Sequence, residues 1–367
     1  MSAEGRAADN HSKLLPAMLV LFAGSGCSAL IYEIVWYQLL QLAIGSTAVS
    51  LGVLLATFMG GLCLGSWLLP RLFAPGRRDV NPLKLYALIE LGIGALGLFE
   101  LVLIPLIDKV YVAGAQSGAP GIVLRALFCA IALLPPTVLM GASLPAIARW
   151  ARSGGRGASW WGLLYGINIA GAVVGSLVAG FWLLRVYDIY VATFAAAAIN
   201  VLVGATAWLL ARHVQVEPEP AADGPGDLGR WSVLITIAFS GAVSMGAQVV
   251  WTRIMGLMLG ATVYVFSIIL AVFLTGLGVG AALGSWAGRR WKPRLLLGWS
   301  QALAALGLAW TAWQVGTSLP YWPVAPQSNT EPAIIFQIDL VRCLWALLPA
   351  TFFWGAAVPL AFAGASR

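Results

Sequence analysis

Charged residues and histidine are scarce in this sequence. Of its 367 residues only 10% are Asp, Glu, Lys or Arg, whereas 60% are hydrophobic, which excludes an ordinary soluble globular domain. The two histidines, His11 and His213, lie outside the apolar runs, so histidine cannot ligate haem within them. The four cysteines lie singly inside apolar runs, so we expect small buried side chains there and neither a disulfide framework nor a metal site. We expect no cofactor.

Long apolar runs are what the sequence has instead. Each is roughly 20 residues or longer, enough to cross a hydrocarbon core about 30 Å thick. The first run has no small-residue cleavage site, so residues 1–14 are interpreted as a cytoplasmic N-terminal tail and not as part of a signal peptide. We predict ten membrane spans, at about 15–44, 47–70, 83–107, 122–148, 160–186, 189–211, 231–258, 263–288, 295–317 and 339–364.

The basic residues indicate how these spans are oriented. With the N-terminus in the cytoplasm, 16 of the 21 Lys and Arg residues fall in cytoplasmic segments. The net charge of +7 is therefore a topology signal, and no nucleic-acid partner is predicted. The Pro- and Gly-rich segment 212–230 is interpreted as a cytoplasmic linker.

A stretch of the first span recurs in the seventh. At a constant offset of 215 residues, the shared positions are Gly26/Gly241, Trp36/Trp251, Gly45/Gly260 and Thr47/Thr262. The pattern Pro135-x-Thr137-x-x-x-Gly141-x-x-x-Pro145 recurs as Pro349-x-Thr351-x-x-x-Gly355-x-x-x-Pro359. The chain thus contains a duplicated half-protein, with a six-helix membrane repeat over 15–211 and a second, truncated four-helix repeat over 231–367.

The number of spans before the linker determines the relation between the copies. Because that number is even, both copies enter the membrane from the same side, which is the arrangement of the two halves of major facilitator transporters. We therefore predict an all-α integral membrane protein. It is a polytopic bundle of about ten transmembrane helices, major-facilitator-like, with a parallel internal duplication of six plus four spans. Glycines four residues apart, such as Gly61/Gly65 and Gly276/Gly280, predict close helix packing, either static or along a moving interface.

Ionisable residues inside the spans are the candidates for function, because each costs at least about 2.5 kcal/mol at the bilayer centre unless it is paired or hydrated. Glu33 lies near mid-depth in the first span, and its repeat mate is the neutral Gln248. Arg253 lies nearer the outer side of the seventh span. If these two spans face each other, Glu33 and Arg253 form an ion pair that locks the halves together. The other interpretation is a cation or proton site at Glu33.

Glu90 in the third span is the next polar intrusion. Together with Glu33, Tyr32 and Tyr37 it is a candidate for binding a small cationic solute. Asn168 in the fifth span needs a partner in lipid, either an interhelical hydrogen bond or a bound substrate. The sequence contains no catalytic motif, so enzymatic activity is left open.

Four of these patterns together resemble a known family. They are Ser25-Gly-x-Ser-Ala-Leu-Ile-Tyr-Glu33-x-Val-Trp36, Gly45-Ser-Thr47, Pro136-Thr137-x-x-x-Gly141-x-x-x-Pro145 and Leu164-Tyr165-x-x-Asn168-x-x-Gly171-Ala-x-x-Gly175. Over nearly its whole length the chain is similar to the bacterial fused major facilitator/spermidine synthase-like membrane proteins. In that family a cytoplasmic aminopropyltransferase-like domain follows the membrane region, and we find no counterpart of that domain here. The resemblance implies a multi-pass protein of the bacterial cytoplasmic (inner) membrane.

Three classes of function stay open. The first is a module that binds or transports a polyamine-like or other small solute. The second is a non-transporting anchor or accessory subunit that docks a partner enzyme or membrane complex. The third is the membrane part of an aminopropyltransferase whose catalytic domain lies outside this chain. The expected partners are the lipid bilayer, a small cationic solute, and a protein that completes the two missing spans or supplies a catalytic domain.

Overall fold

The structure is a computed structural model that describes residues 3–45, 47–73, 80–116, 121–153, 157–212, 228–322 and 332–365. The chain divides into two compact units, Met1–Ala222 and Asp223–Arg367, and each is described by itself. The boundary between them falls within the predicted linker 212–230, of which residues 213–227 lie outside the described part of the chain.

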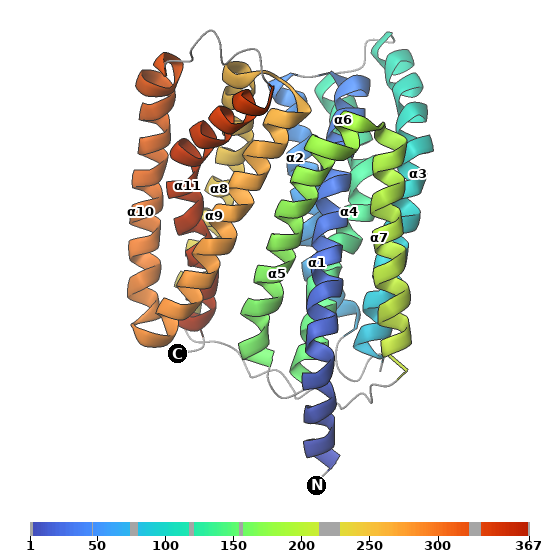
Figure 1. Cartoon of the computed structure of the whole chain (residues 1–367), viewed down its shortest axis with the longest axis vertical. Coiled ribbons are helices and arrows are strands. Elements are labelled where there is room, and N and C mark those ends of the chain that lie inside the picture. Colours follow the sequence, from blue (N-terminus) through green and yellow to red (C-terminus); the bar gives the residue numbers. More distant parts are fainter. Residues whose placement is uncertain are drawn as a thin grey trace. The chain divides into compact units, whose positions relative to one another are not determined.

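Every regular element of the described residues is helical (Figure 1). The first unit contains α1 (Ala3–Ile44), α2 (Ala48–Leu72), α3 (Pro82–Gln116), α4 (Gly121–Ser153), α5 (Gly157–Val178), the π-helical turn η1 (Ala179–Leu183), α6 (Leu184–Val186) and α7 (Ile189–Leu210). The second unit contains α8 (Leu228–Leu259), α9 (Val263–Arg290), α10 (Pro293–Trp313), η2 (Gln314–Ser318), η3 (Leu319–Tyr321) and α11 (Pro332–Ala365).

Ten helical segments among the described residues are long and apolar enough to cross a membrane, so the chain is a multi-pass membrane protein in a lipid bilayer. The predicted all-α polytopic bundle is confirmed, and the observed spans follow the predicted ones closely. Two starts differ. Helix α1 runs back to Ala3 through the polar tail, and α11 begins at Pro332, earlier than the predicted residue 339. Pro332 is the first residue of α11, and proline suits the first position of a helix.

In both units the duplicated motif lies where one long helix ends and the next begins. Gly45 and Gly260 have positive φ angles of 89° and 108°, which glycine adopts without steric cost. Each is the residue directly after a long helix, α1 and α8 respectively. Thr47 and Thr262 then cap α2 and α9, since each hydroxyl accepts a hydrogen bond from the backbone N–H three residues later. The repeated Gly-x-Thr sequence therefore encodes a helix end followed by a helix start.

Close glycine contacts hold α2 to α4 and, equivalently, α9 to α11. A Cβ atom at Gly65 would overlap the carbonyl oxygen of Val138, and one at Gly280 would overlap that of Phe352. Missing side chains let the backbones approach, which is how helices associate in lipid. The duplication seen in the sequence is thus also a duplication of packing within each unit.

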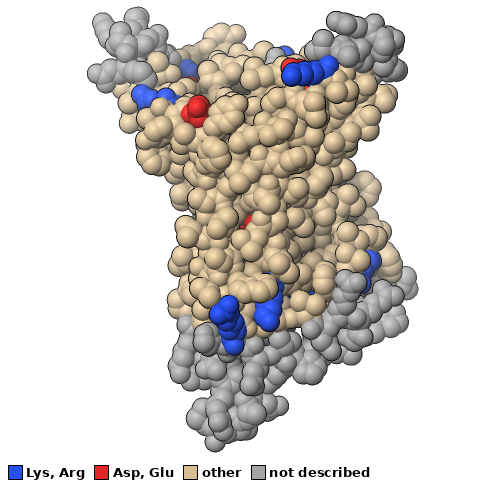
Figure 2. All heavy atoms as spheres, turned by 90° about the vertical axis from the view of Figure 1, so that its right-hand side faces the viewer, with Lys and Arg blue, Asp and Glu red and all other residues tan. Residues whose placement is uncertain are grey.

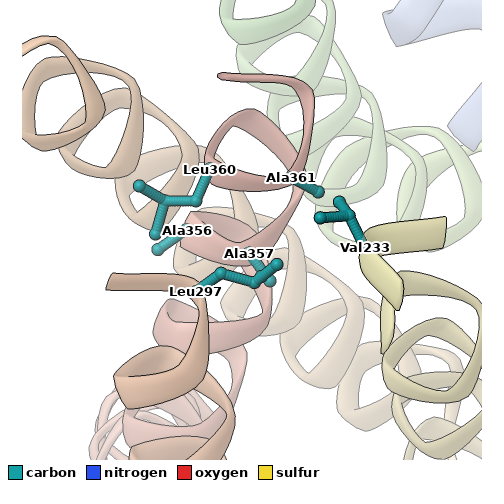
Figure 3. Close-up of a cluster of buried hydrophobic side chains, with 6 residues drawn as sticks. All are labelled: Val233, Leu297, Ala356, Ala357, Leu360 and Ala361. Atoms are coloured by element: carbon teal, nitrogen blue, oxygen red, sulfur yellow. The ribbon is translucent and has the colours of Figure 1, made fainter. Parts of the chain in front are cut away.

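Aromatic and small apolar side chains fill the interior of each unit. In the first, Trp36 lies 6.4 Å from Phe58, measured between ring centroids. In the second, the repeat mates Trp251 and Phe273 lie 6.3 Å apart, and Trp354 packs against both. A separate cluster where α8, α10 and α11 meet consists of Val233, Leu297, Ala356, Ala357, Leu360 and Ala361 (Figure 3).

The outer surface is that of a protein surrounded by lipid. Many large apolar side chains are exposed, among them Val102, Phe194 and Leu202. On the face shown in Figure 2, Lys, Arg, Asp and Glu gather towards the two ends, and the broad band between them is almost free of charge. Such a band matches the hydrocarbon layer, and the charged ends match the interfaces.

Candidate functional site

Two of the three buried glutamates in the described part of the first unit lie on one face of α3. Positions 86, 90, 93, 97 and 100 of this helix are all buried, and their alternating spacing of four and three residues places them on one side. Three of them are Tyr86, Glu90 and Glu100, whose side chains are almost completely inaccessible. A helix face with two carboxyl groups inside a membrane-spanning segment is costly and therefore marks a functional candidate.

Glu90 joins three helices through short hydrogen bonds. The Ser25 hydroxyl of α1 donates to one carboxylate oxygen over 2.6 Å, and the Asn200 amide of α7 donates to the other over 2.6 Å. Gly94, one turn further along α3, leaves room for Asn200, whose Cβ lies 3.3 Å from the place that a Cβ of residue 94 would take. The three residues form one polar cluster, hereafter the Glu90 cluster.

Two tyrosines border the Glu90 cluster. Tyr86 precedes Glu90 by one turn, and its hydroxyl faces both Glu90 and Ser25 without a well-formed hydrogen bond to either. Tyr32 of α1 stacks on Trp36 with ring centroids 4.9 Å apart, and its phenol end presses against Gly97 of α3. The Tyr32 hydroxyl is within electrostatic reach of Glu90, yet it is buried without a hydrogen-bond partner.

Glu33 is placed differently from Glu90. It follows Tyr32 on α1, its side chain is 3% exposed, and its Oε1 atom is buried with no hydrogen-bond partner. Each oxygen of Glu90 accepts one hydrogen bond. Oε1 of Glu33 accepts none, so it has free bonding capacity for a ligand or a partner.

The other predicted site residues do not join the Glu90 cluster. Asn168 of α5 donates its amide to the carbonyl oxygen of Phe22 over 3.0 Å, which is an interhelical hydrogen bond to α1. Tyr37 is half-buried near the end of α1. Gln248 is buried and Arg253 half-buried on α8 of the second unit, so the proposed Glu33–Arg253 pair would join two units and stays a prediction.

Sequence reasoning missed Ser25, Tyr86 and Asn200. A signal existed for Asn200, because it is the lone amide in an Ala- and Val-rich span and therefore needs a partner in lipid. Ser25 is the first residue of the duplicated stretch, and its repeat mate Ser240 is also a serine. The sequence therefore gives no sign that Ser25 has a role specific to the first unit. Glu100 on the same face of α3 is 1% exposed, and its Oε2 atom lacks a hydrogen-bond partner.

Among the described residues no group of three or more His, Cys, Asp or Glu side chains is arranged to hold a metal ion. All four cysteines, which lie within the described ranges, are unpaired.

Comparison with known proteins adds little to this geometry. No family model matches the chain, and no curated protein matches it. Among solved structures, a bacterial homolog of the human lysosomal transporter Spinster, in an inward-facing and unoccupied conformation, is 13% identical. That alignment covers 97% of this chain and 80% of the other, with a TM-score of 0.49. An auto-inhibited POT family peptide transporter is 14% identical over 96% of this chain and 88% of the other, with a TM-score of 0.37. At these levels of similarity, function has to be argued from the residues themselves.

Proposed function

We propose that the chain is a membrane-embedded module that binds and transports a small cationic solute, with Glu33 as the residue that contacts it. The observation that carries this proposal is the free bonding capacity of Glu33 Oε1, which is buried inside a membrane-spanning helix without a hydrogen-bond donor. An ionised carboxyl group in such a place requires compensation by a cation, a donor or water. A positively charged solute would supply both the charge and the missing donor.

The neighbours of Glu33 suit a polyamine-like solute. Trp36 lies about one turn after Glu33 on α1, and Tyr32 directly precedes it. Aromatic rings attract ammonium groups through their negatively charged faces, and the effect grows where water is excluded. Alternating methylene and ammonium groups of such a solute would match the aromatic rings and the Glu33 carboxylate.

The motif resemblance supports the same class of solute. If the chain belongs with the fused major facilitator/spermidine synthase-like proteins, its helices are the membrane part of a protein related to polyamine chemistry. The cytoplasmic orientation of the N-terminus, the inner-membrane location and a partner that carries an aminopropyltransferase domain belong to this proposal. They rest on the quoted motifs and on the Lys and Arg count.

A second candidate function is that of a non-transporting anchor or accessory subunit. The aromatic clusters favour it, since Trp36 with Phe58 and Trp251 with Phe273 and Trp354 fill the interiors of the two units. The Glu90 cluster also ties α1, α3 and α7 together. A scaffold that docks a partner enzyme needs this kind of rigidity and no solute path.

Uptake by proteoliposomes separates the two functions. The full chain, reconstituted in liposomes with an inside-negative potential, should accumulate radiolabelled spermidine or putrescine above empty-vesicle background. Glu33→Gln should reduce uptake at least tenfold, whereas Glu100→Gln, which removes another buried carboxyl group, should retain most of it. Background uptake by the wild-type protein, together with no effect of spermidine on its melting temperature, would rule out the transport proposal and favour the anchor.

A further inference from the structure

No basic residue in the described part of the chain would neutralise the Glu90 carboxyl group when it is ionised. In the described part of the chain no Lys or Arg pairs with Glu90, which accepts hydrogen bonds from Ser25 and Asn200 and is faced by the Tyr86 hydroxyl. Glu90 is fully inaccessible and lies within the span Pro82–Tyr111. Hydrogen-bond donors disperse a negative charge but do not cancel it, and an uncompensated charge at this depth is unfavourable.

The cluster also has more bonding capacity than it uses. Oδ1 of Asn200 and the hydroxyl oxygen of Tyr32 are buried without hydrogen-bond partners, and the Tyr86 hydroxyl faces Glu90 and Ser25 without a well-formed hydrogen bond. Each of the three side chains is at most 1% exposed. Buried polar atoms are nearly always satisfied, so several unsatisfied oxygens beside one carboxylate point to an additional ligand.

The groups around Glu90 are neutral on every helix packed against it. From α1 come the Ser25 and Tyr32 hydroxyls, from α7 the Asn200 amide, and from α3 itself the Tyr86 hydroxyl. Neither α4 nor Glu33 contributes a hydrogen bond or a charge interaction to the carboxyl group. A carboxyl group with only neutral hydroxyl and amide groups around it, several of which carry free oxygen lone pairs, suits a hard monovalent cation or a proton.

We infer that the Glu90 cluster is a binding site for one small monovalent cation, a sodium ion or a proton. The Glu90 carboxylate supplies the charge, and the oxygens of Ser25, Asn200, Tyr86 and Tyr32 supply the remaining ligands or accept a hydrogen bond from the protonated carboxyl group. Binding neutralises the buried charge and alters the hydrogen bonds that join α1, α3 and α7. The site lies wholly in the first unit and does not depend on the proposed transport at Glu33.

The second unit shows that the helical scaffold does not require this charge. The position that matches Glu90 is Gln301, which is half-buried and contacts Ser300 on its own helix. Leu297 stands where the first unit has Tyr86, and Ala247 where it has Tyr32. An amide is therefore tolerated at the matching place, so Glu90→Gln is a suitable test variant.

The melting temperature of the full chain in detergent measures binding without any transport assay. In one arm, sodium chloride replaces choline chloride at constant ionic strength and pH 8. In the other, the pH is lowered from 8 to 6 without sodium. A ligand that binds only the folded state raises the melting temperature, and we expect a rise of roughly 2 °C or more in the arm that supplies the true ligand. Glu90→Gln should lose this response, whereas Glu100→Gln should keep it.

Two milder variants keep the test decisive if Glu90→Gln does not fold. Asn200→Ala and Tyr86→Phe retain the carboxyl group but remove ligand atoms, so each should move the midpoint of the response at least tenfold in cation concentration. Wild-type midpoints in both variants would overturn the site as described. It would equally be overturned if neither arm stabilised the wild-type protein, or if Glu90→Gln responded as the wild type does. A lower melting temperature of Glu90→Gln that is independent of both cations would show that the cluster is structural only.

Discussion

Gly61 of α2 lies so close to Thr137 of α4 that a Cβ atom at position 61 would overlap the threonine hydroxyl. Gly276 of α9 stands in the same relation to Thr351 of α11. In both units the threonine hydroxyl donates to carbonyl oxygens of the preceding turn of its own helix. The hydroxyl cannot turn away without breaking these bonds, so this contact has little freedom to adapt.

The first prediction concerns this contact. Gly61→Ala should destabilise the protein by about 1–3 kcal/mol, because the added methyl group overpacks a rigid helix contact. Gly60→Ala is the matched control, since a Cβ atom there has nothing within 4 Å and alanine favours the helix. Thermal melting in detergent should give a lower midpoint for Gly61→Ala than for Gly60→Ala. Equal midpoints for the two neighbours would contradict the packing described above.

Much of the fold could be predicted from the sequence, because apolar runs, basic residues and repeated motifs are all local patterns. The pairs Gly61/Gly276 and Thr137/Thr351 were visible as matched positions. That each glycine faces its threonine was not visible, because the rotation of two helices about their axes depends on packing.

The site was only partly predictable for the same reason. Glu90 stood out as an ionisable residue in a span, but its donors are 65 and 110 residues away in the chain. Ser25 and Asn200 resemble many other small polar residues of membrane helices. Only the position of each along its helix and the direction of its side chain bring it to Glu90. The predicted pairing of Glu33 with Arg253 depends on how the two units meet, and it stays a prediction.

The second prediction tests the contact between Tyr32 and Gly97. Gly97→Ala should lower stability by about 1–3 kcal/mol, because its methyl group would overlap the phenol ring. Tyr32→Leu should also destabilise, since it removes the stacking on Trp36. The double variant should lose less than the sum of the two, because leucine leaves room for the new methyl group. Strictly additive losses in a melting experiment would show that the two positions do not touch.

The third prediction concerns topology. The distribution of 16 basic residues on one side against five elsewhere predicts that the N-terminus and the linker 212–230 lie in the cytoplasm. The segment 318–338 should then lie on the opposite side. Reporter fusions at residue 222 and within 318–338, each active on one side of the membrane only, should give opposite signals. The same signal from both fusions would refute this orientation.

The last prediction decides what Glu33 does. If Glu33 contacts a cationic solute, Glu33→Gln should abolish uptake while the melting temperature without solute stays close to that of the wild type. The amide of Gln248 at the matching position shows that the scaffold accepts the change. If Glu33 instead pairs with Arg253 and locks the two units together, Glu33→Gln and Arg253→Gln should each lower the melting temperature.

The double variant separates these outcomes. A lock predicts that Glu33→Gln with Arg253→Gln costs less than the sum of the single changes, by roughly 0.5–3 kcal/mol of coupling, because the first change already leaves the other partner unpaired. Arg342 offers the matched control, since it pairs with Asp339 on its own helix, 3.5 Å away. Glu33→Gln and Arg342→Gln should therefore add within about 0.5 kcal/mol. Coupling with Arg253 but not with Arg342 would assign Glu33 to the lock. Additivity with both arginines, together with lost uptake, would assign it to the solute.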